Sequence, residues 1–334
     1  MLSYANILDA LARLNLLEPA EKPLSTKLHG GISSEIYKFD LQLGSVCIKS
    51  ALPTLKSDPE WHVPVERSAA EWEWLKLAEQ IVPGMVPDPI GYDECANIVV
   101  MAYLEPDLHP NWKDLLRHGQ IDPSFAAATA DKLVDFHNAT ANVEMVAEKF
   151  GNDQIFHDIR LEAYFLAAGR TVPIVNSLMT ELVEITANTK CALVHGDVSP
   201  KNILAGPDGP IFLDAECAWY GEPAFDAAFC LTHFLLKCLW QPQWKSHYLE
   251  CHQSFRETYL SKANWLDQTE LDRRVTQLHL GILLARVAGR SKVEYISDPA
   301  LHNLVKIFTT ENLLDNLEST AEVAVLWKRK LDDH

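Results

Sequence analysis

Positive charge is scarce in this sequence. Its 334 residues include 29 Lys and Arg against 46 Asp and Glu, which gives a formal net charge of −17 at pH 7. Nucleic-acid backbones and anionic membrane surfaces attract basic proteins, so this balance disfavours both as partners. It slightly favours a cationic or neutral small molecule.

Several other features are absent. No apolar run reaches the 18 residues of a membrane-spanning helix, and the N-terminus lacks the pattern of a secretory signal. The seven cysteines form neither a CxxC motif nor a zinc-binding spacing. We therefore expect a cytoplasmic protein with reduced cysteines. No GxxxxGK[ST] occurs, and no GxGxxG joins a strand to a helix, which excludes P-loop and dinucleotide-binding folds.

Hydrophobic periodicity divides the chain into two parts. Residues 25–41, "SVCIKSAL" and "NIVVMAYLEPD" predict strands, whereas the N-terminus and residues 65–82 predict helices, and "PGMVPDPIGYD" reads as a break. Further helices are predicted at 112–118, 123–141, 155–168, 173–188, 224–240, 244–262, 268–288 and 299–317. We predict an α+β, bilobal fold, with a small β-rich lobe (1–103) and a larger, mainly helical lobe (104–334). A cleft between two such lobes is a common ligand site.

One short stretch gathers polar residues around predicted strands. "LVHGDVSPKNILAGPDGPIFLDAE" places Asp197 and Asn202 five residues apart across a turn, and ends a strand with Asp214 and Glu216. A carboxylate beside a substrate hydroxyl can take its proton, and Asn and Asp oxygens suit Mg²⁺ beside phosphates. These spacings predict half of a phosphoryl-transfer site.

The first lobe supplies candidates for the other half. The loop of Gly30, Gly31, Ser33 and Ser34 offers backbone N–H groups to phosphates. Lys49 stands on a predicted buried strand, where an unpaired charge is costly, so it needs a carboxylate. We expect Glu71 of the following helix to be that partner, in preference to Glu66 or Glu73.

The motifs resemble the aminoglycoside phosphotransferase and choline kinase superfamily, which has a protein-kinase-like fold. "HGDVSPKN" resembles its HGDxxxxN loop, and "FLDAECAWYGEPAFDAAF" its strand-end Asp segment. "EWLKLAEQIVPGMVPDPIGYD" and "RLEAYFLAAG" are locally similar to methylthioribose kinases. Asn202 departs from that group, where a Ser is usual, and matches aminoglycoside, choline and homoserine kinases.

The resemblance implies a role for each matching residue. Asp197 is the catalytic base or orients the hydroxyl; Asn202 and Asp214 bind Mg²⁺, and Glu216 joins the metal shell or orients Asp214. Lys49 contacts ATP phosphates and is held by Glu71. The adenine-facing hinge consists of Met101, Ala102, Tyr103 and Leu104, and Asp226 braces the catalytic loop.

Some residues carry two readings. Trp219 and Tyr220 suit either stacking on a substrate or core packing. Arg286, in a C-terminal segment that resembles other bacterial members, is a candidate for a substrate contact or a structural role. Lys201 reads as a solvated loop lysine in preference to a phosphate contact, and His195 as a brace in preference to a catalyst.

The sequence thus predicts an ATP- and Mg²⁺-dependent kinase of a small-molecule hydroxyl. A methylthioribose-like sugar, an amino alcohol and an aminoglycoside remain open as substrates, and a homodimer remains open as the assembly. The alternative is a catalytically silent nucleotide-binding regulatory protein on the same fold. A protein kinase is disfavoured because "YGEPAFD" follows Asp214 within a few residues and leaves no activation segment.

Overall fold

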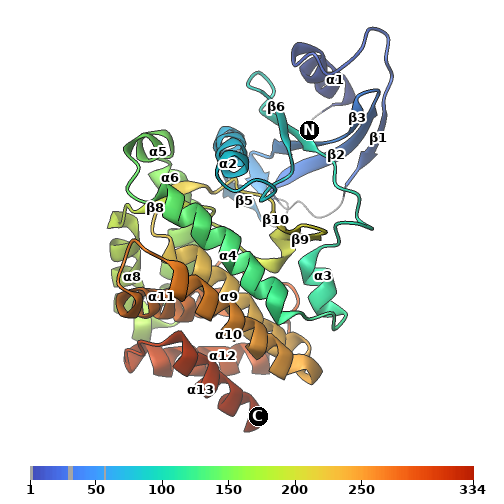
Figure 1. Ribbon diagram of the computed structural model, residues 1–334. Helices are drawn as coiled ribbons and strands as arrows, with labels where there is room; N and C mark the ends of the chain where they lie inside the picture. Colours follow the sequence, from blue (N-terminus) through green and yellow to red (C-terminus); the bar gives the residue numbers. More distant parts are fainter. Residues whose placement is uncertain (1–2, 29–32, 56–57) are drawn as a thin grey trace.

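The computed structural model describes residues 3–28, 33–55 and 58–334. Figure 1 shows a lobe built on a β-sheet above a larger mass of helices. The predicted mixed α+β fold is therefore confirmed. In the part of the chain that the structure describes, no helix combines the length and apolarity needed to cross a membrane, and all seven cysteines are free thiols.

The sheet of the first lobe has five antiparallel strands. Their order is β1 (Leu24–Lys27), β2 (Ser34–Leu41), β3 (Gly44–Ala51), β7 (Ile98–Ala102) and β6 (Pro89–Asp93). A separate pair, β4 (Thr54–Leu55) and β5 (Asp58–His62), follows β3. The sequence reading missed β6 because of its Pro and Gly residues. β6 is an edge strand with Pro89 as its first residue, a position where proline removes no ladder hydrogen bond.

Alternation along β3 explains why Lys49 faces the rest of the protein. Val46 and Ile48 belong to an apolar cluster with Ile7 and Leu11 of α1 (Tyr4–Arg13), which covers one face of the sheet. Successive side chains on a strand point to opposite faces. Lys49 therefore points away from α1, toward the side of α2 (Arg67–Ile81).

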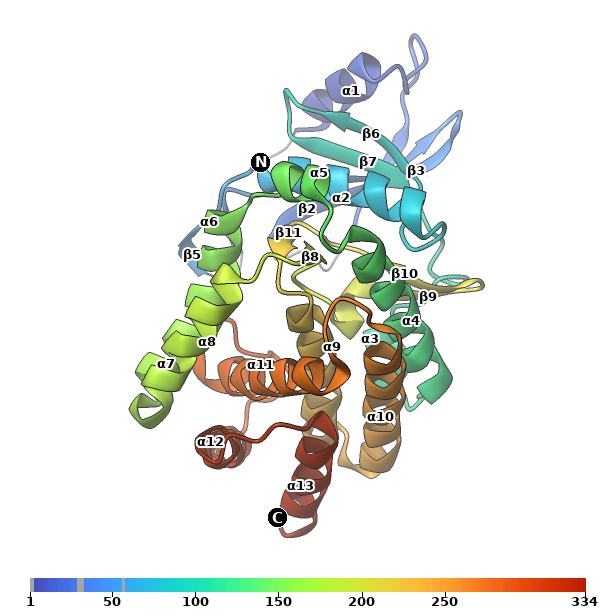
Figure 2. The ribbon, with the colours of Figure 1, turned by 60° about the vertical axis from the view of Figure 1, so that its left-hand side comes forward.

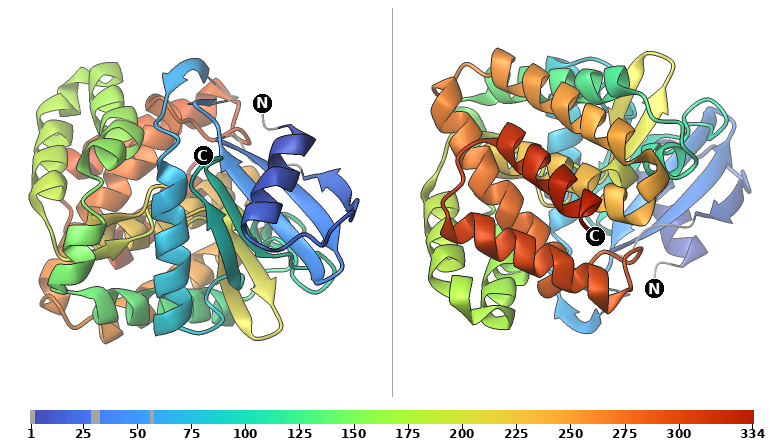
Figure 3. Two further views of the ribbon diagram at one scale, coloured as in Figure 1. Left: turned by 90° about the horizontal axis from the view of Figure 1, so that it is seen from above. Right: turned by 90° about the horizontal axis from the view of Figure 1, so that it is seen from below.

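The second lobe is helical. Figures 2 and 3 show α9 running into its middle, α11 crossing α9, and α12 and α13 covering the end farthest from the sheet, where the C-terminus lies. The bounds are α3 (Trp112–Arg117), α4 (Pro123–Thr140), α5 (Glu144–Lys149), α6 (Asp153–Phe156), a π-helix (His157–Leu166), α7 (Ala167–Thr171), α8 (Asn176–Asn188), α9 (Ala224–Trp240), α10 (Lys245–Lys262), α11 (Gln268–Ala288), α12 (Pro299–Leu314) and α13 (Thr320–Asp332).

Most of these helices match the sequence prediction, and three features do not. The sequence reading did not predict α5. The helix expected at 155–168 is replaced by α6, a π-helix and the start of α7. The sequence reading did not predict α13, although Val323 and Trp327, four residues apart, are both buried on one side of it. The predicted lobe division at residues 103 and 104 falls between the end of β7 and the start of α3.

Two short strand pairs interrupt the helices between the lobes. β8 (Ala192–Val194) pairs with β11 (Trp219–Gly221), and β9 (Ile203–Gly206) pairs with β10 (Gly209–Phe212). The loops that link these strands contain the polar residues singled out in the sequence.

Candidate active site

The loop after β8 turns sharply and is tied to the start of α9. Gly196 has a φ of +81°, and a Cβ there would lie 2.9 Å from the Cβ of Cys217, so only glycine fits. The Asp226 carboxylate accepts hydrogen bonds from the backbone N–H groups of His195 (2.7 Å) and Gly196 (2.8 Å). His137 Nε2 lies 3.3 Å from the same carboxylate. Asp226 thus braces the loop backbone, as the sequence indicated.

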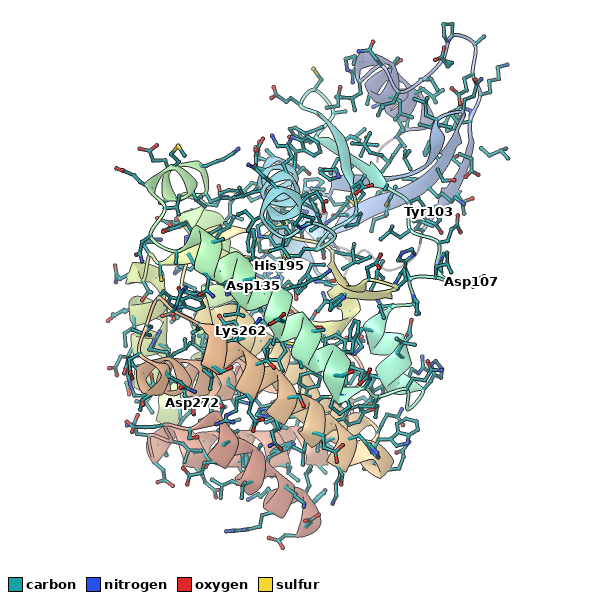
Figure 4. The ribbon with its side chains drawn as sticks, viewed as in Figure 1. Tyr103, Asp107, Asp135, His195, Lys262 and Asp272 are labelled. Atoms are coloured by element: carbon teal, nitrogen blue, oxygen red, sulfur yellow. The ribbon has the colours of Figure 1, made fainter. Side chains whose placement is uncertain are left out.

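His195 holds the loop from the inside. Its Nδ1 accepts a hydrogen bond from the Asp197 N–H (3.1 Å), and its Nε2 lies 3.1 Å from the Leu213 carbonyl oxygen, to which it donates. Its ring packs edge-on against Trp74 of α2, and Figure 4 places it below α2 beside α4. Burial lowers the pKa of His195, so the ring is neutral. These contacts agree with a bracing role.

Asp197 faces two cations. Its Oδ2 lies 3.2 Å from Arg160 Nη2 and 3.2 Å from Lys201 Nζ, and the Ser199 hydroxyl lies 3.4 Å from its Oδ1. Burial by itself raises the pKa of the Asp197 carboxyl, but the charges of Lys201 and Arg160 outweigh burial and hold that pKa below its usual range. Asp197 is therefore a carboxylate throughout the physiological pH range. The Lys201 side chain is 43% exposed, as expected for a solvated loop lysine, and its ammonium group in addition pairs with Asp197.

The sequence reading did not single out Arg160. It lies in the π-helix, and its Nε also donates to the carbonyl of Gly196, so one guanidinium binds both the backbone and the carboxylate of the loop. π-Helical turns occur frequently at functional sites. The sequence signal that could have indicated Arg160 is the segment "RLEAYFLAAG", which begins at this residue. In the sequence, this segment indicated only a local similarity to methylthioribose kinases.

The β9–β10 hairpin brings Asn202 and Asp214 to one end. Ile203 stands opposite Phe212, and the next residue, Leu213, donates its N–H to the Asn202 carbonyl (2.8 Å). The Asn202 Nδ2 donates to the carbonyl of Asp197 (3.1 Å), a bond that does not engage its Oδ1. Asp214 has a φ of +70°, a strained backbone for a residue other than glycine, which is common at functional sites.

The donor set at this end suits a magnesium ion. An amide oxygen from Asn202 and a carboxylate from Asp214 are hard oxygen ligands, and Mg²⁺ takes one or two protein carboxylates together with substrate phosphates and water. The described residues contain no group of three His, Cys, Asp or Glu side chains arranged to hold a metal by themselves. Ligands other than protein side chains, such as water or phosphate oxygens, would complete the coordination of a magnesium ion here.

Lys49 links the sheet to this site. Its ammonium lies 2.7 Å from Glu71 Oε1, and it also forms an ion pair with Asp214. The expected Lys49–Glu71 pair is thus present. Burial lowers the pKa of Lys49, but Asp214 and Glu71 outweigh burial and raise it, so Lys49 remains charged. Burial and the like charge of Asp214 raise the pKa of Glu71.

Glu216 has a different partner from the one expected. Its Oε2 accepts from Arg67 Nε (3.0 Å) and lies 3.4 Å from the Ser34 hydroxyl. Arg67 is fully buried at the start of α2, and its other nitrogens donate to the carbonyls of Val63, Pro64, Ser33 and Leu52. Glu216 therefore joins the strand-end segment to the first lobe, and its place in a metal shell stays a prediction.

The predicted nucleotide loop and hinge are only partly described. Gly30 and Gly31 lie outside the described residues, whereas the Ser33 carbonyl accepts from Leu52 N–H (2.8 Å). In the hinge, Met101 is buried and the Ala102 N–H donates to the Asp88 carbonyl. Tyr103 is labelled in Figure 4, on the chain that leaves β7. Nucleotide contacts by Ser33, Ser34 and the segment from Met101 to Leu104 remain predictions.

The three substrate candidates divide into two groups. The Trp219 ring stacks on Phe156 at 4.2 Å and its Nε1 bonds to Asp153, while Tyr220 is also buried on β11. Both residues are buried on β11, which pairs with β8, and this favours the core-packing interpretation; substrate stacking by these rings stays a prediction. Arg286, in contrast, lines a recess together with Lys201.

Comparison with known proteins points to one family. The model of the "Phosphotransferase enzyme family" matches residues 26–258. The chain is 25% identical to methylthioribose kinase 1 of Oryza sativa subsp. japonica over 227 residues, which cover 58% of this chain and 51% of that protein. It is 27% identical to 4-hydroxytryptamine kinase of Psilocybe cyanescens over 255 residues, or 65% and 69% of the two chains.

A solved structure has the same fold. An ethanolamine kinase of Plasmodium vivax superposes with a TM-score of 0.58 at 14% identity, covering 94% of this chain and 91% of that one. This likeness confirms the protein-kinase-like fold. The match to the methylthioribose kinase spans about half of that protein's length.

Proposed function

Because this chain belongs to the phosphotransferase enzyme family, we propose that it is an ATP-dependent kinase that phosphorylates a hydroxyl group of a small molecule. The observation that carries the proposal is the ion pair between Lys49 of the sheet and Asp214 of the hairpin. It brings the predicted phosphate-binding half and the predicted metal-binding half into direct contact. Phosphoryl transfer depends on positioning and charge neutralisation, which these groups supply.

In this proposal Asn202 and Asp214 hold the magnesium ion. When bound, that ion neutralises charge on the nucleotide phosphates. Lys49, fixed by Glu71, binds nucleotide phosphate oxygens. The Lys49–Asp214 contact then gives way to contacts with the nucleotide, and Glu71 keeps the lysine in place.

Asp197 orients the attacking hydroxyl. Its carboxylate is held ionised by Lys201 and Arg160, which makes it a weak proton acceptor but a constant hydrogen-bond acceptor. In a loose phosphoryl-transfer transition state the attacking oxygen carries little positive charge until late, so its proton leaves late. Orientation is therefore the main contribution of Asp197, and proton acceptance follows it.

The named relatives are kinases of a sugar and of an amine-bearing compound, so the acceptor class is not set by the family. The competing proposal is a silent nucleotide-binding regulator. It requires loss of a chemical group, whereas Lys49, Glu71, Asp197, Asn202 and Asp214 are all present.

ADP formation across a panel of sugars, amino alcohols, hydroxy acids and aminoglycosides tests the proposal. We expect acceptor-dependent ADP release on one class, abolished in Asp197→Ala with nucleotide binding retained. Nucleotide binding without turnover on any acceptor, unchanged in Asp197→Ala, would instead support the regulatory protein.

A further inference from the structure

A small recess opens beside the catalytic loop, and four of its eight lining residues are Lys or Arg. Its charged or titratable lining residues are Lys113, Lys201, His233, Lys237, Arg286 and Glu294. They come from α3, the loop, α9, α11 and the segment after α11. Lys201 connects the recess to the reaction centre because its ammonium lies 3.2 Å from Asp197 Oδ2. In a chain of net charge −17, such a concentration of positive charge is unexpected.

Among the described residues, two of these cations, Lys237 and Arg286, form no direct ion pair, although the Glu294 carboxylate of the same recess attracts both at longer range. Lys113 pairs with Glu294, and Lys201 pairs with Asp197. Among the residues that the structure describes, no carboxylate lies within 4.0 Å of the Lys237 ammonium or the Arg286 guanidinium. Both side chains are more than nine-tenths buried. A buried cation without a paired anion is costly, so proteins rarely retain one without a use for it.

The contacts that Lys237 and Arg286 do make are with neutral groups. The Lys237 ammonium lies 5.0 Å from the Trp240 ring and 5.2 Å from the Tyr295 ring. Arg286 Nη1 donates to the Tyr164 hydroxyl (2.9 Å) and to the Ser291 carbonyl (2.6 Å). These contacts orient the two cations but give neither a directly paired carboxylate, and Glu294, which pairs with Lys113, compensates their charges only in part.

Two further polar atoms at the recess lack a partner. Arg286 Nε and His233 Nε2 are buried and have no hydrogen-bond partner among the described residues. His233 Nδ1 lies 3.2 Å from the Tyr295 hydroxyl. Burial lowers the pKa of His233 well below its usual value, so the ring is neutral, and a Tyr295 hydroxyl that donates to Nδ1 leaves the ring proton on Nε2. The recess thus offers unused donors together with unpaired charge.

We propose that this recess binds an anionic group, a carboxylate or a phosphate, carried by the hydroxyl-bearing acceptor. Lys237, Arg286 and His233 bind the anion, and the acceptor's hydroxyl reaches Asp197 past Lys201. The inference rests on the proposed kinase function and specifies its substrate class. It replaces the weak preference for a cationic acceptor drawn from net charge, because the local charge at the site has the opposite sign.

The state of Lys237 agrees with this assignment. Burial and the nearby Lys113 lower the pKa of Lys237 to about 7. An anion in the recess would offset both effects and restore the charge of Lys237.

Direct anion binding tests the inference without knowledge of the acceptor. The probes are malonate for the carboxylate and inorganic phosphate for the phosphate, each titrated calorimetrically into the full chain with and without saturating ADP. Lys237→Gln and Arg286→Gln remove the proposed cations one at a time. Lys330→Met, which removes an exposed lysine of α13 paired with Glu311, is the matched control. Lys49→Met reports on anions that bind at the nucleotide site.

We expect at least one probe to bind saturably in the presence of ADP. The Kd of that probe should rise about tenfold or more in Lys237→Gln and in Arg286→Gln, because each change removes about one charge-assisted hydrogen bond to the anion. The Kd should stay unchanged in Lys330→Met and Lys49→Met. The stronger probe identifies the anionic group. ADP affinity, measured in Lys237→Gln, Arg286→Gln and Lys330→Met, shows that the fold is kept.

Two results would overturn the inference. One is no saturable binding of either probe; the other is binding that both recess variants leave intact or that only Lys49→Met removes. Failure of the kinase proposal looks different, because anion binding would then persist while no acceptor supports ADP release. Conversely, turnover on cationic acceptors, with no binding of either anion, would keep the kinase and reject the anionic acceptor.

Discussion

Lys201 and Asp197, four residues apart on the catalytic loop, form an ion pair with an Nζ–Oδ2 distance of 3.2 Å. The lysine has two effects in the proposed reaction. It holds the Asp197 carboxylate ionised, and it places a positive charge at the point where the cation-lined recess meets the proposed reaction centre.

Lys201→Met should therefore change the pH dependence of the reaction. Removing its charge raises the pKa of Asp197, so the carboxylate becomes protonated at a higher pH and the acid limb of the rate profile moves upward in pH. We also expect kcat to fall about 10²-fold, the lower end of the effect of removing one group that stabilises a transition state. A pH–rate profile measures both. An acid limb identical to that of the unmodified protein would show that Lys201 does not control Asp197.

Gly196→Ala should disrupt the catalytic loop. The φ of +81° is strained for alanine, and the new Cβ would lie 2.9 Å from Cys217. We expect a loss of about 1–3 kcal/mol in the free energy of unfolding, measured in urea, together with loss of activity. Gly151→Ala is the matched control, since the nearest atom to its added Cβ is the Ala147 carbonyl oxygen at 4.0 Å. Equal stability of the two variants would contradict the strained turn.

Arg67→Met should be among the most destabilising single changes. It leaves the Glu216 carboxylate and four backbone carbonyls without their buried donor. Breaking a buried ion pair in this way costs about 3–5 kcal/mol, and Arg67→Met with Glu216→Gln should recover part of it. Arg170→Met, which breaks the exposed pair with Glu162, should cost less than about 1 kcal/mol. Similar urea midpoints for the Arg67 and Arg170 variants would refute the prediction.

Lys237 should make stability depend on pH. Burial and Lys113 lower its pKa from the ordinary 10.5 to about 7, with Glu294, Cys230 and Asp114 acting in the opposite direction. Between these two values the unfolded chain binds more protons at Lys237 than the folded protein does, so its contribution to stability rises from pH 7 to pH 10.5. Lys237→Met should flatten that rise and stabilise the protein at pH 7 and below.

Thermal unfolding across this pH range measures the effect. Malonate or phosphate should reduce the rise in stability with pH. A bound anion raises the pKa of Lys237 again and stabilises the protein most at the pH values where the lysine is charged. A rise in stability of the same size in Lys237→Met would mean that other groups cause it.

The sequence alone predicts the contacts of a residue when a local pattern or motif indicates its partner. It does not predict contacts between residues that are far apart in the sequence and meet only in the fold. The bounds of α9 and α11 and the Lys49–Glu71 pair were predictable, because periodicity and the cost of a buried lysine are local signals. The Asp226 brace followed from family resemblance.

The residues that the sequence reading missed act across long separations. Arg160 reaches Gly196 and Asp197 from 36 and 37 residues away, and Arg67 reaches Glu216 from 149 residues away. No periodic pattern distinguishes such arginines from surface ones. The lack of a direct ion pair at Lys237 and Arg286 is likewise visible only once five separate segments enclose them. Trp219 was ambiguous because an aromatic ring after a catalytic loop suits a pocket wall and a core equally well.

The most direct test of the central claim is ADP formation by Asp197→Asn. This change keeps the size of the side chain and removes the negative charge of the carboxylate that Lys201 and Arg160 keep ionised. We predict that acceptor-dependent ADP release falls by about 10³-fold or more while ADP affinity is unchanged, as expected for a group that acts on the reaction and not on nucleotide binding. Turnover within a few-fold of the unmodified protein would contradict the role of Asp197 and, with it, the proposed phosphoryl transfer at this loop.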